Sequence, residues 1–365
     1  MRKNLVAAAA LAALTAMAGV ASAANVQVYG RVDVGLKYTH VKHGADTLEM
    51  NAGGRSHNRI GLNISEDLGN GWKAKGYLEN GFTLDDGNFD TTGQIFNRRS
   101  ILAIASPYGE LGMGRAGTVQ STMAPYTMGL IKYDPFGTSY GYASIGSTFA
   151  NTSRVNNGIH YISPKFSGFN FGMSYSFGDS KDENGYSDND HTLALAANYT
   201  GKDLYLSGTF ANVTYGDNKR EDARLYGIGG WWRFLPEWRL FAGAAYQDGW
   251  KSAAGLSVTA NKNGVTSDEY RNGFDGYSAL LGMDWRSGPH KVMAGVQYFN
   301  GELKKNSSAD YQRTVFATAY EHYFSKTFIG YCAVTHSITS GQAKDAASSK
   351  SSDATQVFIG VNKNF

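Results

Sequence analysis

Large apolar residues alternate with small or polar residues along much of the chain. In the stretch FNFGMSYSFG, one parity carries Phe169, Phe171, Met173, Tyr175 and Phe177, and the other carries asparagine, glycine and serine. A period of two is that of a β-strand, whose successive side chains point to opposite faces of the sheet. About sixteen such segments follow one another, each near the ~9–11 residues with which a tilted strand crosses a bilayer. The pattern predicts an all-β chain.

The connections between these segments alternate in length. Short turns such as DLGNG, PYGE, PKFSG, TGKD, LPE and SGPH contain glycine, proline, asparagine or aspartate, the residues that turns favour. Between them lie long polar loops at 179–190, 250–273 and 338–355. Short turns at one rim and long loops at the other are typical of an outer-membrane barrel, whereas a β-sandwich does not need this asymmetry.

The N-terminus has the pattern of a secretory signal peptide. Arg2 and Lys3 form a positive region, an apolar run follows, and ASA at 21–23 is a small-residue cleavage site. The apolar run is shorter than the ~18–20 residues that a membrane-spanning helix needs. We expect residues 1–23 to be removed on export and residues 24–365 to form one transmembrane β-barrel domain in the cell outer membrane.

Composition narrows the class of protein further. Loss of Arg2 and Lys3 leaves 32 of the 34 basic residues against 31 acidic ones, which argues against nucleic acid as a partner. The single cysteine, Cys332, excludes a disulfide framework and a cysteine-based metal site. Aromatic side chains gather beside the short turns, which favours a membrane-interface girdle over ordinary core packing. These aromatic residues are Tyr161, Phe166, Trp232, Phe234, Trp238, Trp285, Tyr323 and Phe324.

Several stretches in order resemble the Gram-negative general porins, specifically their neisserial and β-proteobacterial branch. They are VQVYGRVDVGL, SHNRIGLNISEDLGNGWKAKGYLENGF, FNRRSILAIASPYGELGMGRAG, SRVNNGIHYISPKFSGFNFGMSYSFG, the YFSKT turn and the terminal Phe365. The part of the chain from about 180 to 310 matches mainly in rhythm. The resemblance implies a homotrimer of 16-stranded antiparallel barrels in outer-membrane lipid and lipopolysaccharide, each with a water-filled pore for small hydrophilic solutes.

The resemblance also implies that the third external loop folds inward and narrows the pore. GRAG at 114–117 would close the fifth strand, and the constriction loop would cover residues 118–152. Related porins often carry an acidic tip of the PEFG kind, whereas DPFG here offers only Asp134, beside Lys132. A strongly negative loop face is therefore not expected.

Strand parity assigns the side chains that line the pore. If Val32 and Val34 face lipid, their neighbours face water, and lipid-facing arginine at mid-membrane depth would cost about 2–4 kcal/mol. If Leu102 and Ile104 face lipid, the period of two places Arg99 rather than Arg98 toward the pore, although a β-bulge could exchange the two. The expected pore-lining residues are Arg31, Asp33, Arg59, Lys73, Lys75, Glu79, Arg99, Arg154 and His160 on strands, with Lys132 and Asp134 on the loop.

These bases outnumber the acids, and charged rings set the selectivity of pores. The sequence therefore predicts a passive diffusion channel with weak anion preference. The alternative is that the cations merely satisfy Asp33, Glu79 and loop carboxylates.

Other functions are weighed against this one. A solute-specific channel could use Tyr126, Tyr133, Tyr140 and Tyr142 to stack on sugars, or these tyrosines could simply pack the loop. A barrel enzyme would need a convergent catalytic group, but the histidines are scattered, so we expect no enzymatic activity and no catalytic residues. An adhesin-like barrel would need longer external loops. GMGRAG lacks the strand-to-helix context of a dinucleotide site, and the acidic loop at 179–190 lacks calcium-loop spacing, so no cofactor and no metal are expected.

Overall fold

The structure is a computed structural model that describes residues 24–178, 189–216, 220–252, 267–343 and 353–365. The predicted signal peptide and most of the acidic loop lie outside the described residues. The first strands are β1 (Asn25–Val41), β2 (Thr47–Ala52), β3 (Arg59–Gly69), β4 (Trp72–Gly81), β5 (Arg99–Ser106), β6 (Gly109–Gly117), β7 (Arg154–Ile162) and β8 (Phe169–Ser176). They are followed by β9 (His191–Thr200), β10 (Leu204–Thr214), β11 (Ala223–Leu235), β12 (Trp238–Trp250), β13 (Phe274–Ser287), β14 (His290–Leu303), β15 (Asn306–Tyr323), β16 (Phe328–Ser340) and β17 (Ala354–Asn364).

Helical structure is sparse. Three 3-10 helices, η1 (Leu130–Lys132), η2 (Gly141–Ala143) and η3 (Ile145–Ser147), lie between β6 and β7, and α2 (Ser267–Asn272) precedes β13. Within the described ranges, no helix is long and apolar enough to cross a membrane.

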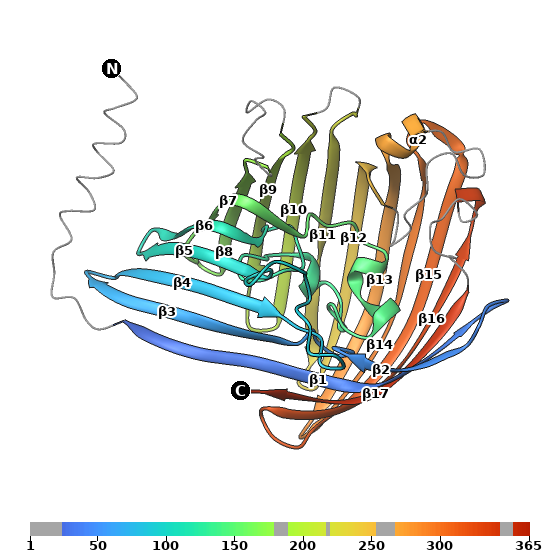
Figure 1. The fold of residues 1–365 in the computed structure, drawn as a ribbon, viewed down its shortest axis with the longest axis horizontal. Helices are drawn as coiled ribbons and strands as arrows, with labels where there is room; N and C mark the ends of the chain where they lie inside the picture. The colour runs from blue at the N-terminus through green and yellow to red at the C-terminus, as the bar shows by residue number, and fades with distance from the viewer. Residues whose placement is uncertain (1–23, 179–188, 217–219, 253–266, 344–352) are drawn as a thin grey trace.

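The strands pair antiparallel with their neighbours and close into a barrel (Figure 1). The last strand completes the ring, because residues 31–41 of β1 pair with residues 354–364 of β17. On its other edge, β1 pairs with β3 over residues 25–31 and with β2 over residues 34–39. Since β2 and β3 share one place in the wall, the seventeen strand segments form a closed 16-stranded barrel, as predicted.

The segment at 53–58 interrupts the second wall position, and we call it the notch. The backbone of this segment does not form the β-sheet hydrogen bonds of its neighbours, and residues of β1 provide other hydrogen-bond partners. The Asp33 carboxylate accepts hydrogen bonds from the backbone N–H of Arg55 at 3.4 Å and of Ser56 at 3.1 Å. The Asp33 N–H in turn donates to the Asn58 side-chain oxygen at 2.5 Å. Buried backbone groups need such partners, so Asp33 stabilises the notch.

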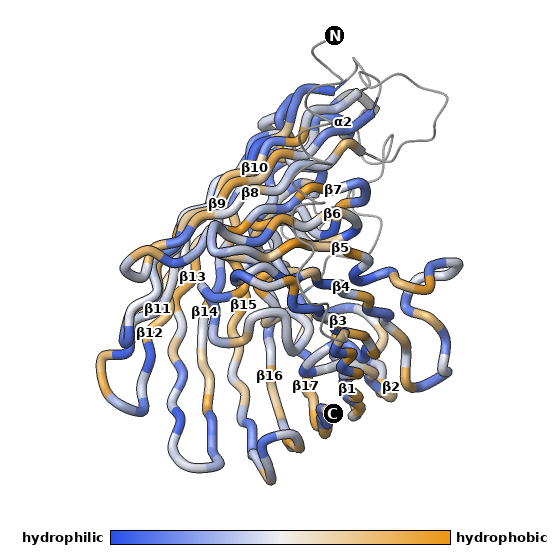
Figure 2. The backbone as a smooth tube through the Cα atoms, turned by 90° about the vertical axis from the view of Figure 1, so that its left-hand side faces the viewer, coloured by the Kyte–Doolittle hydropathy of each residue, from blue (hydrophilic) through white to orange (hydrophobic). Residues whose placement is uncertain are grey.

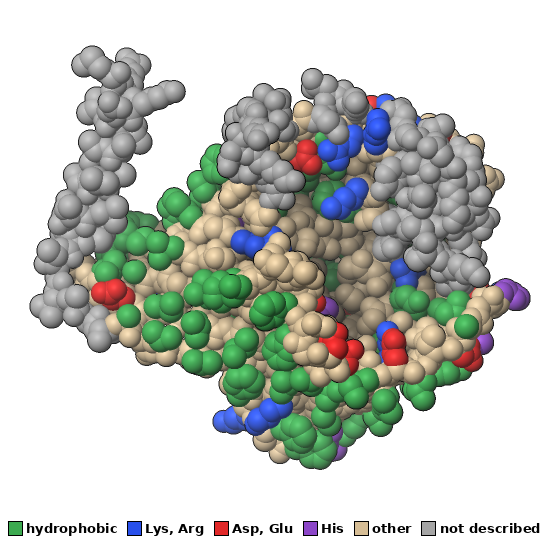
Figure 3. Space-filling model, viewed as in Figure 1, with side chains coloured by type: hydrophobic (Ala, Val, Ile, Leu, Met, Phe, Trp, Pro, Cys, Tyr) green, Lys and Arg blue, Asp and Glu red, His purple; other side chains and the backbone are tan. Residues whose placement is uncertain are grey.

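The apolar parity faces out of the barrel. Phe169 and Phe171 on β8 are 60% and 50% exposed, whereas Ser174 on the other parity is fully buried. Figure 2 shows the same alternation of hydropathy along successive strands, and Figure 3 shows hydrophobic side chains spread over the outside of the wall. β8 is the seventh wall strand, and its aromatic face is the exterior, as its period predicts.

The two rims differ. The connections at the end where β1 begins and β17 ends contain two to six residues, as between β3 and β4 or between β7 and β8. In the β3–β4 turn, Gly69, Asn70 and Gly71 all have positive φ, which favours glycine or asparagine. At the opposite rim, long segments follow β4 and β6. The asymmetry expected from the sequence is present.

Candidate functional site

A polar cavity of about 400 Å³ lies on the inner side of the wall. Strands from both sides of the β1–β17 closure contribute to it, together with the notch and with residues of the 118–152 segment. Among the described residues that line it, seven are cationic and two are carboxylates. The cations are Arg31, Arg55, Arg59, Arg98, Arg99, Arg154 and Lys291, and the carboxylates are Glu79 and Glu321. We call this the basic cavity.

Strand register explains why the arginines gather. Arg31 on β1 stands directly opposite Arg59 on β3, and Glu79 on β4 stands directly opposite Arg99 on β5. Residues that face each other across antiparallel strands have Cβ atoms about 4.5–5.5 Å apart, and like charges in such a pair are destabilising. The Arg31–Arg59 pair is therefore not explained by stability of the wall.

Glu79 is the acceptor at the centre of the arginines. Its carboxylate is 2.7 Å from Arg98 Nε, 3.3 Å from an Arg99 nitrogen and 4.0 Å from an Arg59 nitrogen. The Tyr29 hydroxyl donates a further hydrogen bond at 2.8 Å. Only 1% of Glu79 is exposed, so it cannot present its charge to a solute. One carboxylate for three guanidinium groups leaves this side of the cavity positive.

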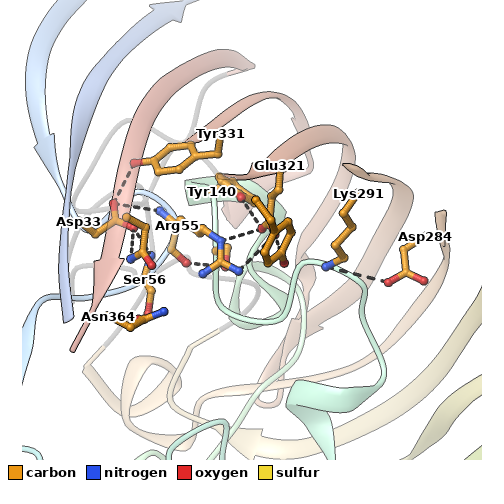
Figure 4. A network of polar contacts seen from close by, with 12 residues as sticks. Asp33, Arg55, Ser56, Tyr140, Asp284, Lys291, Glu321, Tyr331 and Asn364 are labelled. Carbon is orange, nitrogen blue, oxygen red and sulfur yellow. Dashed lines mark hydrogen bonds and ion pairs between the residues drawn. The ribbon is translucent and has the colours of Figure 1, made fainter. Parts of the chain in front are cut away.

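The opposite side of the cavity holds a second ion pair (Figure 4). Arg55 in the notch donates from Nε to Glu321 Oε1 at 2.8 Å and from a terminal nitrogen to Oε2 at 3.1 Å, the bidentate geometry of strong pairs. Burial alone would lower the pKa of Arg55, but the Glu321 carboxylate outweighs it and raises that pKa above its usual value. Arg55 therefore stays charged. Tyr140 and Tyr323 also donate to Glu321, at 2.8 and 2.7 Å.

The segment at 118–152 contacts the inner side chains of several strands. The Tyr133 hydroxyl donates to the backbone oxygen of Ser207 on β10 at 3.0 Å, and Tyr140 reaches Glu321 on β15. Gln297 on β14 donates to Asp134 Oδ2 at 2.6 Å and to the Ala143 carbonyl at 2.7 Å. The Thr148 hydroxyl donates to Gln297 Oε1 at 2.8 Å. The single side chain of Gln297 is thus hydrogen-bonded to three residues of the segment.

Five of the eleven residues expected in the pore line the basic cavity together: Arg31, Arg59, Glu79, Arg99 and Arg154. Asp33 lies on the same side of β1 but is fully buried, where it supports the notch. Lys75 pairs with Glu110 at 2.8 Å, outside the lining of the cavity, and Lys73 is exposed and also outside it. Both lysines share the parity of Glu79 on β4 but lie at another depth of the barrel.

The other expected residues also lie apart from the lining. His160 is fully buried, stacked on Tyr126 with ring centroids 4.8 Å apart. Lys132 is exposed and sits 4.7 Å over the ring of Tyr205. Asp134 is only 4% exposed, and burial raises its pKa to about 8. Asp134 is therefore mostly neutral at pH 7 and adds little negative charge to the pore.

Five of the ten ionisable residues that line the cavity are not among those assigned to the pore from the sequence. Strand parity indicates both Lys291 and Glu321. Lys291 precedes the outward-facing Val292 and Glu321 follows the outward-facing Tyr320, so the period of two places both side chains on the inner face. Arg98 lies one residue before β5, so parity alone left it ambiguous. Arg55 and His57 lie in the notch, where no strand period applies.

Comparisons with known proteins agree with this architecture. A family model described as Gram-negative porin matches residues 7–342. An outer membrane porin protein of Bordetella pertussis is 29% identical over 403 residues, which cover 100% of both chains. Outer membrane porin protein 32 of Delftia acidovorans is 35% identical over 186 residues, 48% of this chain and 50% of that one. Among solved structures, the anion-selective porin from Comamonas acidovorans has a TM-score of 0.71 at 22% identity, covering 94% of this chain and 100% of that chain.

Proposed function

The chain belongs to the Gram-negative porin family and forms an outer-membrane diffusion channel, and on that premise we propose that its channel prefers small anions to cations. The observation that carries the proposal is the charge of the basic cavity, with seven cations and two carboxylates among the described lining residues. An excess of fixed positive charge lowers the energy of a passing anion and raises that of a cation. The preference is weak, because Glu79 and Glu321 each neutralise part of the cluster.

The 118–152 segment is proposed to narrow the channel beside the basic cavity. Its support is the set of hydrogen bonds to the Ser207 backbone on β10 and to the side chains of Gln297 on β14 and Glu321 on β15, together with its share of the cavity lining. A solute would then pass between this segment and the arginines. Three of the four tyrosines considered for sugar stacking, Tyr126, Tyr133 and Tyr140, are at most 3% exposed. Their burial favours a general channel over a sugar-specific one.

The assembly and processing of the chain are proposed on the same premise. One solved structure with a TM-score of 0.62 to this chain is a trimer form of Vibrio cholerae OmpT, which supports a homotrimer here. The trimer would lie in outer-membrane lipid and lipopolysaccharide, after cleavage of residues 1–23. We assign the chain no catalytic role. Migration of unheated samples on denaturing gels, compared with boiled samples, tests the trimer.

The ion preference is tested by the reversal potential of the purified channel in a planar bilayer with a potassium chloride gradient. We expect a potential of the sign that indicates greater permeability to chloride. A clear preference for potassium would refute the proposal without affecting the assignment to the porin family. A chain that inserts but does not conduct would contradict the channel function itself.

A further inference from the structure

Two histidines and a tyrosine meet on the outer face of the barrel, near the rim with the short turns. His290 on β14 stands directly opposite His322 on β15, and their ring centroids are 5.1 Å apart. The Tyr320 hydroxyl is 2.7 Å from His290 Nδ1 and 3.2 Å from His322 Nδ1. All three side chains lie on the parity of Val292, which is 39% exposed, and opposite to that of Glu321, which is 2% exposed. The cluster therefore has no part in the basic cavity.

We propose that His290, His322 and Tyr320 bind a divalent transition-metal ion of the zinc, copper or nickel class. Neutral imidazole is the commonest protein ligand for these metals, and both rings turn Nδ1 toward the same oxygen. Nitrogen ligands lie about 2.0–2.1 Å from zinc, so two ligand atoms of a tetrahedral site are about 3.3 Å apart. The distance of 3.2 Å between His322 Nδ1 and the Tyr320 oxygen is near that value, and the distance of 2.7 Å from His290 Nδ1 would lengthen by about 0.6 Å. A metal ion can replace the hydrogen bonds with small side-chain movements.

The surroundings hold the ligands in place. Phe324 packs edge-on against His322 with centroids 4.6 Å apart, and Phe328 packs against Phe324 at 5.6 Å. Both histidines and Tyr320 are half-buried, and they lie beside the short connections at 288–289 and 324–327. No group of three or more histidine, cysteine or acidic side chains forms a metal site in the described part of the chain. The proposed ligand set is smaller than such a group, with two imidazoles and one phenol.

The test is a Cu²⁺ titration of the untagged full chain in detergent, followed by electron paramagnetic resonance. We expect a saturable site for a single Cu²⁺, with splitting from two imidazole nitrogens. His290→Ala or His322→Ala should each weaken binding at least ~tenfold, the size of effect seen even for outer-shell partners of metal ligands. Tyr320→Phe should weaken it less and should leave both nitrogen couplings. Single-channel conductance should be unchanged, because the cluster lies outside the pore.

The matched control is His336→Ala on β16. His336 shares the outward parity of exposed Val334 and Ile338, and its Nδ1 contacts the Thr355 hydroxyl at 2.9 Å. This variant should bind copper like the unmodified chain. A spectrum with one nitrogen, or equal affinity in the His290→Ala variant, would overturn the proposal. So would loss of binding on His40→Ala, since His40 lies 2.7 Å from Asp46 and offers another candidate ligand pair. Each of these results leaves the channel function untouched.

Discussion

Replacement of Arg59 by glutamine should reduce the preference for chloride. Arg59 lines the basic cavity and lies 4.0 Å from Glu79, which keeps Arg98 and Arg99 as partners when Arg59 is lost. The Arg59 terminal nitrogen also donates to the Ser56 hydroxyl at 2.7 Å, a contact that glutamine can partly retain. The substitution therefore removes one charge and leaves the rest of the cluster in place.

The size of the effect follows from the dimensions of the cavity. A sphere with the volume of this cavity, about 400 Å³, has a radius near 4.6 Å, so a passing ion lies roughly 6 Å from the lining charges. At that distance in water, one unit charge changes the energy of an ion by about 0.7 kcal/mol. Salt at 0.1 M, with a Debye length of about 10 Å, reduces this to about 0.4 kcal/mol. Because chloride and potassium shift in opposite directions, the permeability ratio should fall about three- to fourfold.

The assay is the reversal potential in asymmetric potassium chloride, measured on single channels of each variant. The control is Lys73→Gln, which removes the same charge from the inner parity but at an exposed position outside the cavity. Repeating both measurements at 1 M salt should shrink the difference, because the Debye length falls to about 3 Å. The reasoning is refuted if Arg59→Gln leaves the ratio unchanged, or if Lys73→Gln changes it as much.

Three further predictions concern stability and gating. Glu321→Gln leaves Arg55, whose side chain is 17% exposed, without its partner and should destabilise the chain by at most about 3–5 kcal/mol in urea unfolding. Replacement of both Arg55 and Glu321 by methionine should cost less. Asp134 has a pKa near 8, raised from 3.8 by burial, so its stabilising contribution is complete below pH 4 and is lost as pH rises through 8. Current fluctuations should therefore grow above pH 8 in the unmodified channel and stay constant in Asp134→Asn. Ile228→Arg places a charge on the lipid face at the middle of β11, where Ile228 is 65% exposed, and should cost about 2–4 kcal/mol, measured as a lower unfolding midpoint in lipid vesicles.

Alternation was enough to predict the barrel, because a strand between lipid and water must obey a period of two along its whole length. The same period gives the face of a side chain but not its depth. Arg59 and Lys75 were assigned to the inner face by the same rule, yet one lines the basic cavity and the other pairs with Glu110 beyond it. Depth depends on tilt and register, which pairing between strands sets and which a single segment does not contain.

The burial of Asp134 within the 118–152 segment could not be predicted from the sequence either. The sequence presents Asp134 as an exposed acidic tip, but Gln297, 163 residues away along the chain, donates a hydrogen bond to it within a buried network. Arg55 was missed for a different reason. It lies where the second wall strand is interrupted, so neither parity nor turn residues indicated that its side chain would reach Glu321.

The notch has a consequence for how such a channel can change over time. On a strand, each pore-facing position is tied to lipid-facing neighbours, so insertion of one residue would exchange the two faces. Residues 53–58 are free of that constraint, because Asp33 and Asn58 anchor them where the ladder is absent. A substitution in this segment therefore changes the pore side without exchanging the faces of the strands, although Arg55 is held by its ion pair with Glu321. The interrupted strand thus separates a pore segment positioned by local hydrogen bonds from strands whose two faces the bilayer fixes.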